Sequence, residues 1–257
     1  MRVSVTTAGR RRARTALRRA CLAGLGAGVL GATLLASTAS AAQRPIGTKP
    51  TLKRSWNARI LLPTMGRAEP SIRARATGRV SPYGPYDREP QYLLVLGTAT
   101  GPGGPWYKVQ LPERPNGAST WVRGAHVRVR PNPYRIRVRL ASRRVQLFKA
   151  GRLVTQARAV VGTDANPTPT GLFAISEEVP QNNRRGFFGP YILTLTAHSE
   201  ALSDFDGGNG QVAIHGTSQP QLLGTAASHG CVRLANPVIT RISRLVPPGT
   251  PVAITAR

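Results

Sequence analysis

Proline and glycine interrupt this chain so often that long regular helices are not expected in most of it. The 257 residues include 27 Gly and 22 Pro, the residues that most often end helices and strands. Between them lie short apolar runs, and residues 134–140 (YRIRVRL) alternate strictly between polar and apolar side chains. A period of two residues is typical of a strand with one buried face. We therefore predict an all-β fold.

Two groups of strand patterns suggest two domains, with residues 131–133 (PNP) between them. The first group, within residues 56–131, contains the runs ARILLP, QYLLVLG, WYKVQLP and STWVRGAHVRV. Residues 106–127 resemble the end of a bacterial SH3-like domain, in which a Trp strand, a Pro-Asn-Gly turn and a Trp-Val strand follow one another. The resemblance implies a small β-barrel that binds peptides or cell-wall material, or that serves only as a spacer.

The second group, within residues 132–257, contains a predicted hairpin over residues 143–162 with its turn at 149–151, and later strands GLFAISEEV, YILTLTAH, GQVAIHG and TPVAITA. One short helix is predicted late in the chain. Asn236 is suited to cap it, Pro237 to its first turn, and Ile239, Ile242 and Val246 recur at helical spacing.

The N-terminus has the pattern of a signal peptide. Arginines are followed by the apolar run 22–36 and by Ala39-Ser40-Ala41, a small-x-small cleavage site. We expect residues 1–41 to be removed on export to the cell wall or periplasm, with 42–55 as a linker; an uncleaved segment would anchor the protein in the membrane. Cleavage would remove Cys21 and leave Cys231 as a lone thiol, a hint of function in an oxidising compartment.

The net charge of +26 limits the classes of molecule that the protein is expected to bind. A strongly basic chain suggests nucleic acid, but an exported chain without a nucleic-acid-binding motif argues against it. Anionic cell-wall polymers are the better expectation. Compositional bias is the alternative, because 32 of the 36 basic residues are Arg.

The residues around Cys231 supply what a thiol nucleophile needs. An imidazole must take the thiol proton and return it to a leaving amine, and backbone N–H groups must face the oxyanion. His215 and His229 are both available as the base, and Gly230 lets the backbone turn sharply before the cysteine. Residues 211–257 contain no carboxylate that could orient a histidine, so a backbone carbonyl such as that of Gly216 is the candidate.

This pattern resembles the signature of the L,D-transpeptidase family with its YkuD-type catalytic domain. The motif residues are HGT at 215–217 and SHGCVRL at 228–234, and the resemblance extends over 134–256, including TPTGLF at 168–173. It implies a β-sandwich-like catalytic domain. It also resolves the choice of base, with Cys231 as nucleophile, His215 as proton acceptor and donor, and the Gly216 carbonyl orienting the ring.

The same resemblance places His229 and Gly230 on the oxyanion side of the site. Arg233 matches the family's Arg or Asn position, where it steadies the loop or the donor peptide. We expect Arg233, Ser228 and Tyr191 to contact the substrate. Residues 180–191 are interpreted as part of a lid over the cleft, with an ordinary connecting loop as the alternative.

The implied reaction is acyl transfer without a cofactor. Cys231 would attack the tetrapeptide stem of peptidoglycan, release D-alanine and form a thioester, from which an amine gives a 3→3 cross-link. The alternatives are L,D-carboxypeptidase activity, attachment of a wall protein, and a non-catalytic wall-binding protein. A zinc site made by His215, His229 and Cys231 is disfavoured, because no fourth ligand is evident.

Overall fold

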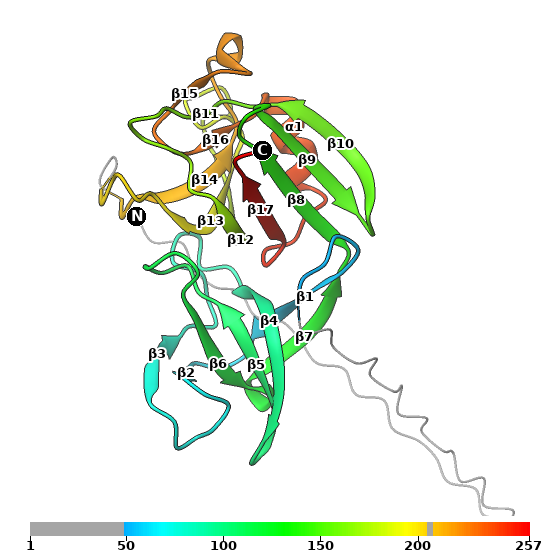
Figure 1. The fold of residues 1–257 in the computed structure, drawn as a ribbon, viewed down its shortest axis with the longest axis vertical. Coiled ribbons are helices and arrows are strands. Elements are labelled where there is room, and N and C mark those ends of the chain that lie inside the picture. Colours follow the sequence, from blue (N-terminus) through cyan, green and yellow to red (C-terminus); the bar gives the residue numbers. More distant parts are fainter. Residues whose placement is uncertain (1–48, 205–207) are drawn as a thin grey trace, which may run out of the picture. The chain divides into compact units, whose positions relative to one another are not determined.

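The computed structural model describes residues 49–204 and 208–257 (Figure 1). The predicted signal peptide 1–41 and residues 42–48 of the predicted linker lie outside the described residues. Within them, strands dominate and there is one α-helix, α1 (Asn236–Ser243), which confirms the predicted all-β fold with one short late helix. Among these residues, no helix has the length and apolar character needed to cross a membrane.

Residues 55–132 form a seven-stranded sheet of order β3-β2-β6-β5-β4-β1-β7 (Figure 1). Its strands are β1 (Ser55–Ile60), β2 (Thr64–Arg67), β3 (Ala76–Val80), β4 (Tyr92–Gly101), β5 (Gly104–Gln110), β6 (Ser119–Arg123) and β7 (Val127–Asn132). The sheet has its own hydrophobic cluster, centred on residues such as Ala58, Leu93 and Val109. It therefore buries a core separate from that of the later strands.

The run STWVRGAHVRV, expected to be one strand, is two strands in the structure. A 3-10 turn, η1 (Gly124–His126), separates β6 from β7. β6 pairs with β5, whereas β7 pairs with β1 at the edge of the sheet, so the chain must change partners between them. Gly124 permits the turn because a Cβ there would lie 2.8 Å from the Pro105 carbonyl oxygen.

Residues 134–255 form an eight-stranded sheet of order β10-β9-β8-β17-β12-β13-β14-β16. Its strands are β8 (Tyr134–Arg139), β9 (Arg144–Lys149), β10 (Arg152–Arg158), β12 (Gly171–Pro180), β13 (Tyr191–His198), β14 (Gln211–His215), β16 (Val232–Arg233) and β17 (Pro251–Thr255). Two short strands, β11 (Val161–Gly162) and β15 (Ala226–Ser228), pair separately in parallel. β17 lies between β8 and β12, so the last strand of this part of the chain pairs with the first.

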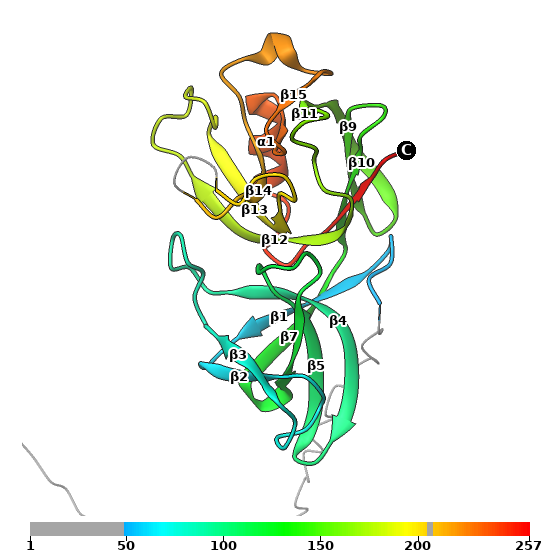
Figure 2. The same ribbon diagram turned by 60° about the vertical axis from the view of Figure 1, so that its left-hand side comes forward.

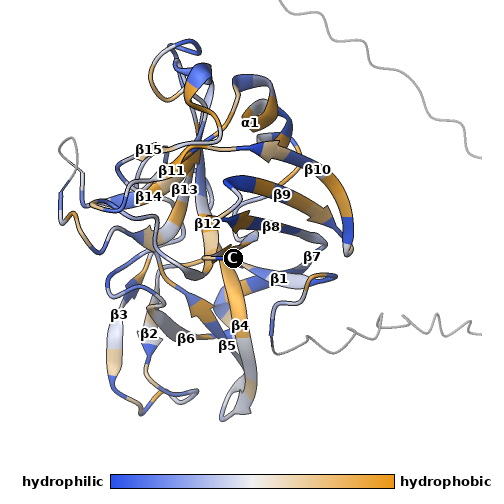
Figure 3. Ribbon diagram, turned by 45° about the horizontal axis from the view of Figure 1, so that its top comes forward, coloured by the Kyte–Doolittle hydropathy of each residue, from blue (hydrophilic) through white to orange (hydrophobic). Residues whose placement is uncertain are grey.

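The core of the second sheet follows from the alternation of its strands, visible in Figure 3 as hydrophobic and hydrophilic segments along them. On β8, Ile136 and Val138 are fully buried, whereas Arg139 is exposed. Burying an aliphatic side chain of this size contributes about 1.5–3 kcal/mol to folding. The alternation predicted for residues 134–140 is therefore confirmed, and it fixes which face of the sheet carries the core.

Helix α1 packs against β13 (Figure 2) with Ile239 and Ile242 buried, as their helical spacing predicts. The prediction that Asn236 caps the helix is wrong. Ala235 holds the cap position without a side-chain hydrogen bond, and Asn236 is the first helical residue. Its Oδ1 instead accepts the backbone N–H of Thr217 at 2.8 Å, so its side chain serves the loop after β14.

The described residues form one compact unit, and buried amide side chains connect the two sheets. Asn57 donates to the Pro248 carbonyl at 2.7 Å, and Asn132 donates to Thr250 Oγ1 at 2.9 Å. Both acceptors lie in the turn that precedes β17. The turn that positions the central strand of the second sheet is thus held by the first sheet.

Candidate active site

The cysteine lies in a tight turn between two short strands. β15 ends at Ser228 and β16 begins at Val232. Ser228 Oγ donates to the Cys231 carbonyl at 2.6 Å and accepts the Gly230 N–H at 3.2 Å. Gly230 has φ +114°, a conformation that favours glycine, while a Cβ there would make only ordinary contacts at 3.6 Å or more. Backbone conformation, and not crowding, therefore requires glycine before the cysteine.

His215 is the last residue of β14, and β16 runs parallel beside it with Arg233 as its partner in register. Its side chain is buried, and its Nδ1 lies 2.7 Å from the Gly216 carbonyl oxygen. This is the orienting contact expected from the sequence. A carbonyl at Nδ1 selects the tautomer with its proton on that nitrogen, which leaves Nε2 as the basic atom.

Gly216 is enclosed on the side where a side chain would be. A Cβ there would clash with Asn236 Oδ1 and lie 2.8 Å from Gly189 Cα. Gly189 has φ +66°, and a Cβ there would clash with the same Asn236 Oδ1 and lie 2.6 Å from Gly216 Cα. The loop after β14, the segment before β13 and the start of α1 therefore interlock behind the imidazole.

His215 and Cys231 line the same cavity, which has a volume of about 20 Å³. Phe187, Phe188 and Arg233 also line it, together with residues of the 199–212 segment. A volume this small holds about one water molecule. The site as it stands is closed to a peptide.

Burial controls the protonation of both groups. It lowers the pKa of His215 to about 4, against the hydrogen bonds of the Gly216 and Phe188 backbones, which work in the opposite direction. Burial also raises the pKa of the Cys231 thiol, against the backbone of Ala213 and the charge of Arg233. At neutral pH the resting pair is thus an uncharged imidazole, able to accept a proton, and an uncharged thiol.

Arg233 brings a positive charge to the edge of this cavity. Its side chain is buried, its guanidinium lies 4.6 Å from the centre of the Phe187 ring, and its Nη1 is 3.4 Å from Gln219 Oε1. Nε is buried without a hydrogen-bond partner among the described residues. A guanidinium held in this way favours a negative charge developing near the thiol.

The segment between β12 and β13 covers the site with two aromatic rings. Phe188 packs edge-on against the His215 ring with centroids 5.1 Å apart, and Phe187 lies 6.0 Å from it. Phe187 is nevertheless 43% exposed. Both residues belong to the predicted lid segment. Their position as two adjacent aromatic residues in a polar loop was the sequence signal for this role, although neither residue was predicted individually.

Ser228 and Tyr191, both expected to contact the substrate, make other contacts in this structure. Ser228 is buried and hydrogen bonds within its own turn. Tyr191 carries the guanidinium of Arg184 above its ring at 5.4 Å and packs on the core cluster. Neither lines the cavity, whereas His229 does. The roles assigned to the cavity residues stay predictions.

The arrangement of possible ligands bears on the alternative of a zinc site made by His215, His229 and Cys231. In the parts of the chain that the structure describes, no group of three or more His, Cys, Asp and Glu side chains is placed to hold a metal ion.

The second part of the chain is similar to a known protein family. Residues 133–254 match the family model of the YkuD L,D-transpeptidase catalytic domain. A protein of Bacillus licheniformis named "Putative L,D-transpeptidase YkuD" is 37% identical over 123 residues, which are 48% of this chain and 66% of that protein. A protein of the same name from Bacillus subtilis is 33% identical over 122 residues, again 48% and 66%. The chain thus matches just under two thirds of the length of these relatives.

Solved structures show weaker likeness. An L,D-transpeptidase from Mycobacterium smegmatis is 14% identical, with 59% of this chain and 90% of that chain covered and a TM-score of 0.39. The catalytic domain of the E. faecium L,D-transpeptidase is 21% identical, with 48% and 96% covered and a TM-score of 0.37. These structural likenesses are too low to bear on function.

A thiol and an imidazole at the ends of neighbouring strands define a cysteine-type site in an all-β domain. Residues 133–254, which contain this site, are similar to the L,D-transpeptidase catalytic domain of the YkuD type.

Proposed function

We propose that the protein is an exported L,D-transpeptidase that acts on the tetrapeptide stems of peptidoglycan through a thioester on Cys231. The observation that carries the proposal is the convergence of Cys231 and the Gly216-bound His215 in one cavity of a domain that matches this family. Residues 1–41 act as the export signal in this proposal.

The reaction begins with proton transfer from the Cys231 thiol to His215 as sulfur attacks the carbonyl of the third stem residue. The carbonyl becomes an oxyanion, and backbone N–H groups of the turn around Cys231 face it. The Gly230 N–H already donates to Ser228 Oγ, so the turn would have to release that bond for Gly230 to contribute. Arg233 adds positive charge nearby.

Collapse of the oxyanion breaks the bond to the terminal D-alanine. His215 returns its proton to the leaving amine, and a thioester remains. The amine of an acceptor stem then attacks the thioester, gives up a proton through His215, and restores the thiol, which leaves a 3→3 cross-link. Water as acceptor gives carboxypeptidase activity by the same route, and an amine of a wall protein gives attachment.

Entry of the substrate requires the segment 181–190 to move. The cavity holds about one water molecule, and Phe187 and Phe188 occupy the space beside the imidazole. Motion of this segment would open the site and let water and substrate reach His215. We therefore assign these residues the role of a lid.

For residues 56–131 we propose an SH3-like domain that supports the catalytic domain through hydrogen bonds. Short strands, a separate hydrophobic cluster and the hydrogen bonds to the 247–250 turn support this assignment. A wall-binding protein without catalysis is disfavoured, because the nucleophile, the base and its orienting carbonyl are all present.

The test is incubation of the purified protein with a disaccharide tetrapeptide, followed by mass spectrometry of the products. We expect free D-alanine and a cross-linked dimer, and neither with Cys231→Ala. Free D-alanine with a trimmed tripeptide in place of the dimer would assign the carboxypeptidase reaction. Equal release of D-alanine by the wild type and the variant would refute the role of Cys231.

A further inference from the structure

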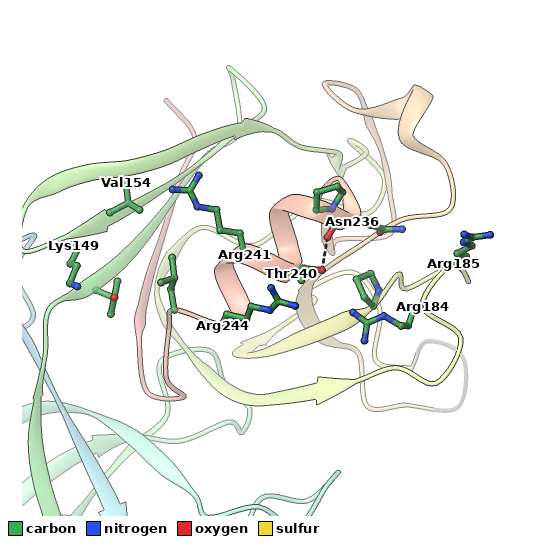
Figure 4. A pocket seen from close by; sticks show the side chains of 12 residues that line it. Lys149, Val154, Arg184, Arg185, Asn236, Thr240, Arg241 and Arg244 are labelled. Atoms are coloured by element: carbon green, nitrogen blue, oxygen red, sulfur yellow. Dashed lines mark hydrogen bonds between the residues drawn. The ribbon is translucent and has the colours of Figure 1, made fainter.

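A larger cavity lies on another part of the catalytic domain. It has a volume of about 870 Å³ and lies between the β9–β10 hairpin, α1 and the segment 181–190 (Figure 4). It shares no lining residue with the cavity at Cys231 and contains neither cysteine nor histidine. The two cavities are thus separate, although the segment 181–190 borders both. We call the larger one the basic groove.

Positive charge from three elements converges on the basic groove. β9 contributes Lys149, and the segment 181–190 contributes Arg184 and Arg185. Arg241 comes from α1, and Arg244 is the C-cap residue that follows it. No Asp or Glu lines it. In Figure 4, Arg244 extends toward Arg184. Such a concentration of like charge in a hollow attracts anions from a distance.

These charges are not neutralised by the protein. Lys149 and Arg184 lie over the rings of Tyr134 and Tyr191, each at 5.4 Å, which leaves their charges in place. Within the described residues, none of the five charged groups forms a hydrogen bond or an ion pair with another part of the chain. Arg241 and Arg244 are exposed to solvent. Their donors are thus available to a ligand.

The arrangement fits a chain of oxyanions. Arg241 lies in the last turn of α1, and the C-cap residue Arg244 keeps helical backbone angles. Their side chains therefore leave the same face, about 4.5 Å apart along the helix axis. The guanidinium fork matches the paired oxygens of a phosphate group, and lysine binds phosphate as a point charge. Apolar side chains of Val154 and Leu245 also line the groove and offer contacts to a carbon backbone.

Nucleic acid fits the groove less well. Proteins that bind single strands stack the bases on exposed aromatic rings. Tyr134 is the aromatic residue that lines the groove among the described residues, and Lys149 lies over its ring. The groove thus has charge for a phosphate chain but little surface for bases.

We propose that the basic groove binds a phosphodiester-linked anionic polymer without bases, which lies along α1 and crosses to the β9–β10 hairpin. A phosphodiester carries its charge at every pH at which the protein is folded, so binding needs no protonation step. The site would hold the enzyme on a polyanion while the cavity at Cys231 stays free. This role goes beyond acyl transfer, and neither proposal depends on the other.

The test measures binding of a synthetic poly(glycerol phosphate) of defined length to the full chain by isothermal titration calorimetry at low and high salt. Arg241→Gln/Arg244→Gln is compared with Arg73→Gln/Arg75→Gln, which removes the same charge from exposed positions in the N-terminal part. We expect about tenfold weaker binding for the groove variant and little change for the control. Binding should weaken with added salt.

Two parallel titrations examine the ligand class. Polyglutamate of equal charge tests for a carboxylate polymer, and an oligothymidylate tests for nucleic acid. No binding of poly(glycerol phosphate), equal losses in the two variants, or tighter binding of either comparison polymer would overturn the proposal. D-Alanine release by the groove variant, measured on the small tetrapeptide substrate, reports separately on the acyl-transfer proposal.

Discussion

At the scale of one residue, His215 illustrates how burial keeps an imidazole uncharged. Two effects compete at its ring: loss of water disfavours the charged imidazolium, and hydrogen bonds to backbone groups favour it. Burial is the larger effect and lowers the pKa to about 4. The resting imidazole is therefore neutral above about pH 5, and it can accept the thiol proton without first losing its own.

The low pKa of His215 predicts the pH dependence of acylation. Since the base is neutral well above its pKa, the rate of acylation should stay nearly constant from about pH 7 down to about pH 5 and fall only near pH 4. Stopped-flow measurement of acylation across this range tests it. A loss with a midpoint near the ordinary histidine pKa of about 6.5 would show that the ring is hydrated in solution.

The sequence was informative at this scale where residues are neighbours along the chain. The spacing of His215, Gly230 and Cys231 indicated a thiol site, and the carbonyl next to His215 was a natural orienting group. Phe188 and Asn236 lie far from these residues in the sequence, and the strand order places them beside the site. Such contacts depend on the whole sheet and leave no local pattern.

At the scale of elements, the site depends on the packing of three backbone segments behind the imidazole. Gly216 follows β14, Gly189 precedes β13, and Asn236 begins α1. A Cβ atom at Gly216 or at Gly189 would clash with the other glycine and with Asn236 Oδ1. Glycine is therefore required at position 216 because there is no room for a side chain.

Gly216→Ala should damage the site by forcing these segments apart. We expect about 1–3 kcal/mol of lost stability and at least a tenfold slower acylation, since overpacking shifts the backbone that orients His215. Thermal unfolding and acylation rates measure both. Gly97→Ala is the matched control, because a Cβ there would make ordinary contacts at 3.7 Å or more. Equal behaviour of the two variants would contradict the account.

Element types were more predictable than element ends. Two-residue alternation correctly indicated β8, and helical spacing of Ile239 and Ile242 correctly indicated α1. The cap of α1 and the break between β6 and β7 were missed, because a distant partner decided each. The backbone N–H of Thr217 donates to the side chain of Asn236, and β7 pairs with β1 and not with the partner of β6.

At the scale of the whole molecule, the N-terminal part supports a wall of the active-site cavity. Arg114 donates to the carbonyls of Ser199 at 2.8 Å, Leu202 at 2.9 Å and Asn209 at 3.3 Å. Ser199 and Leu202 line the cavity that contains Cys231. Arg114, in the connection between β5 and β6, thus holds a segment that borders Cys231.

Arg114→Gln should lower kcat/KM for the stem peptide by about tenfold, because three carbonyls lose a charged donor worth about 1.5–3 kcal/mol per bond. Steady-state kinetics with the tetrapeptide measures the change. Arg73→Gln, at an exposed site, controls for charge alone. Unchanged kinetics in Arg114→Gln would show that the wall holds its shape without the N-terminal part.

A second contact between the two parts depends on pH. Tyr86 N–H donates to Glu177 Oε1 at 3.2 Å. Burial, together with nearby Asp87, raises the pKa of Glu177 to about 7. The unfolded chain releases this proton at lower pH than the folded protein does, so stability falls as pH rises from about 4.5 to about 7.

Glu177→Gln should therefore raise the melting temperature at pH 8 relative to wild type by about 2–4 °C, the shift that ~1 kcal/mol produces in a protein of this size. At pH 5 the difference should be smaller. Thermal scans of both proteins at the two pH values measure it, and a larger gain at pH 5 would contradict the assignment. These contacts join distant segments, so sequence patterns did not reveal them.

The central claim is that Cys231 is the nucleophile, and intact-mass analysis with a carbapenem tests it most directly. The family resemblance implies that such a compound acylates this cysteine. We expect one adduct on the wild-type protein, located to the peptide that contains Cys231 by fragmentation, and none on Cys231→Ala. An unmodified wild type, or an adduct that persists in Cys231→Ala, would contradict the account.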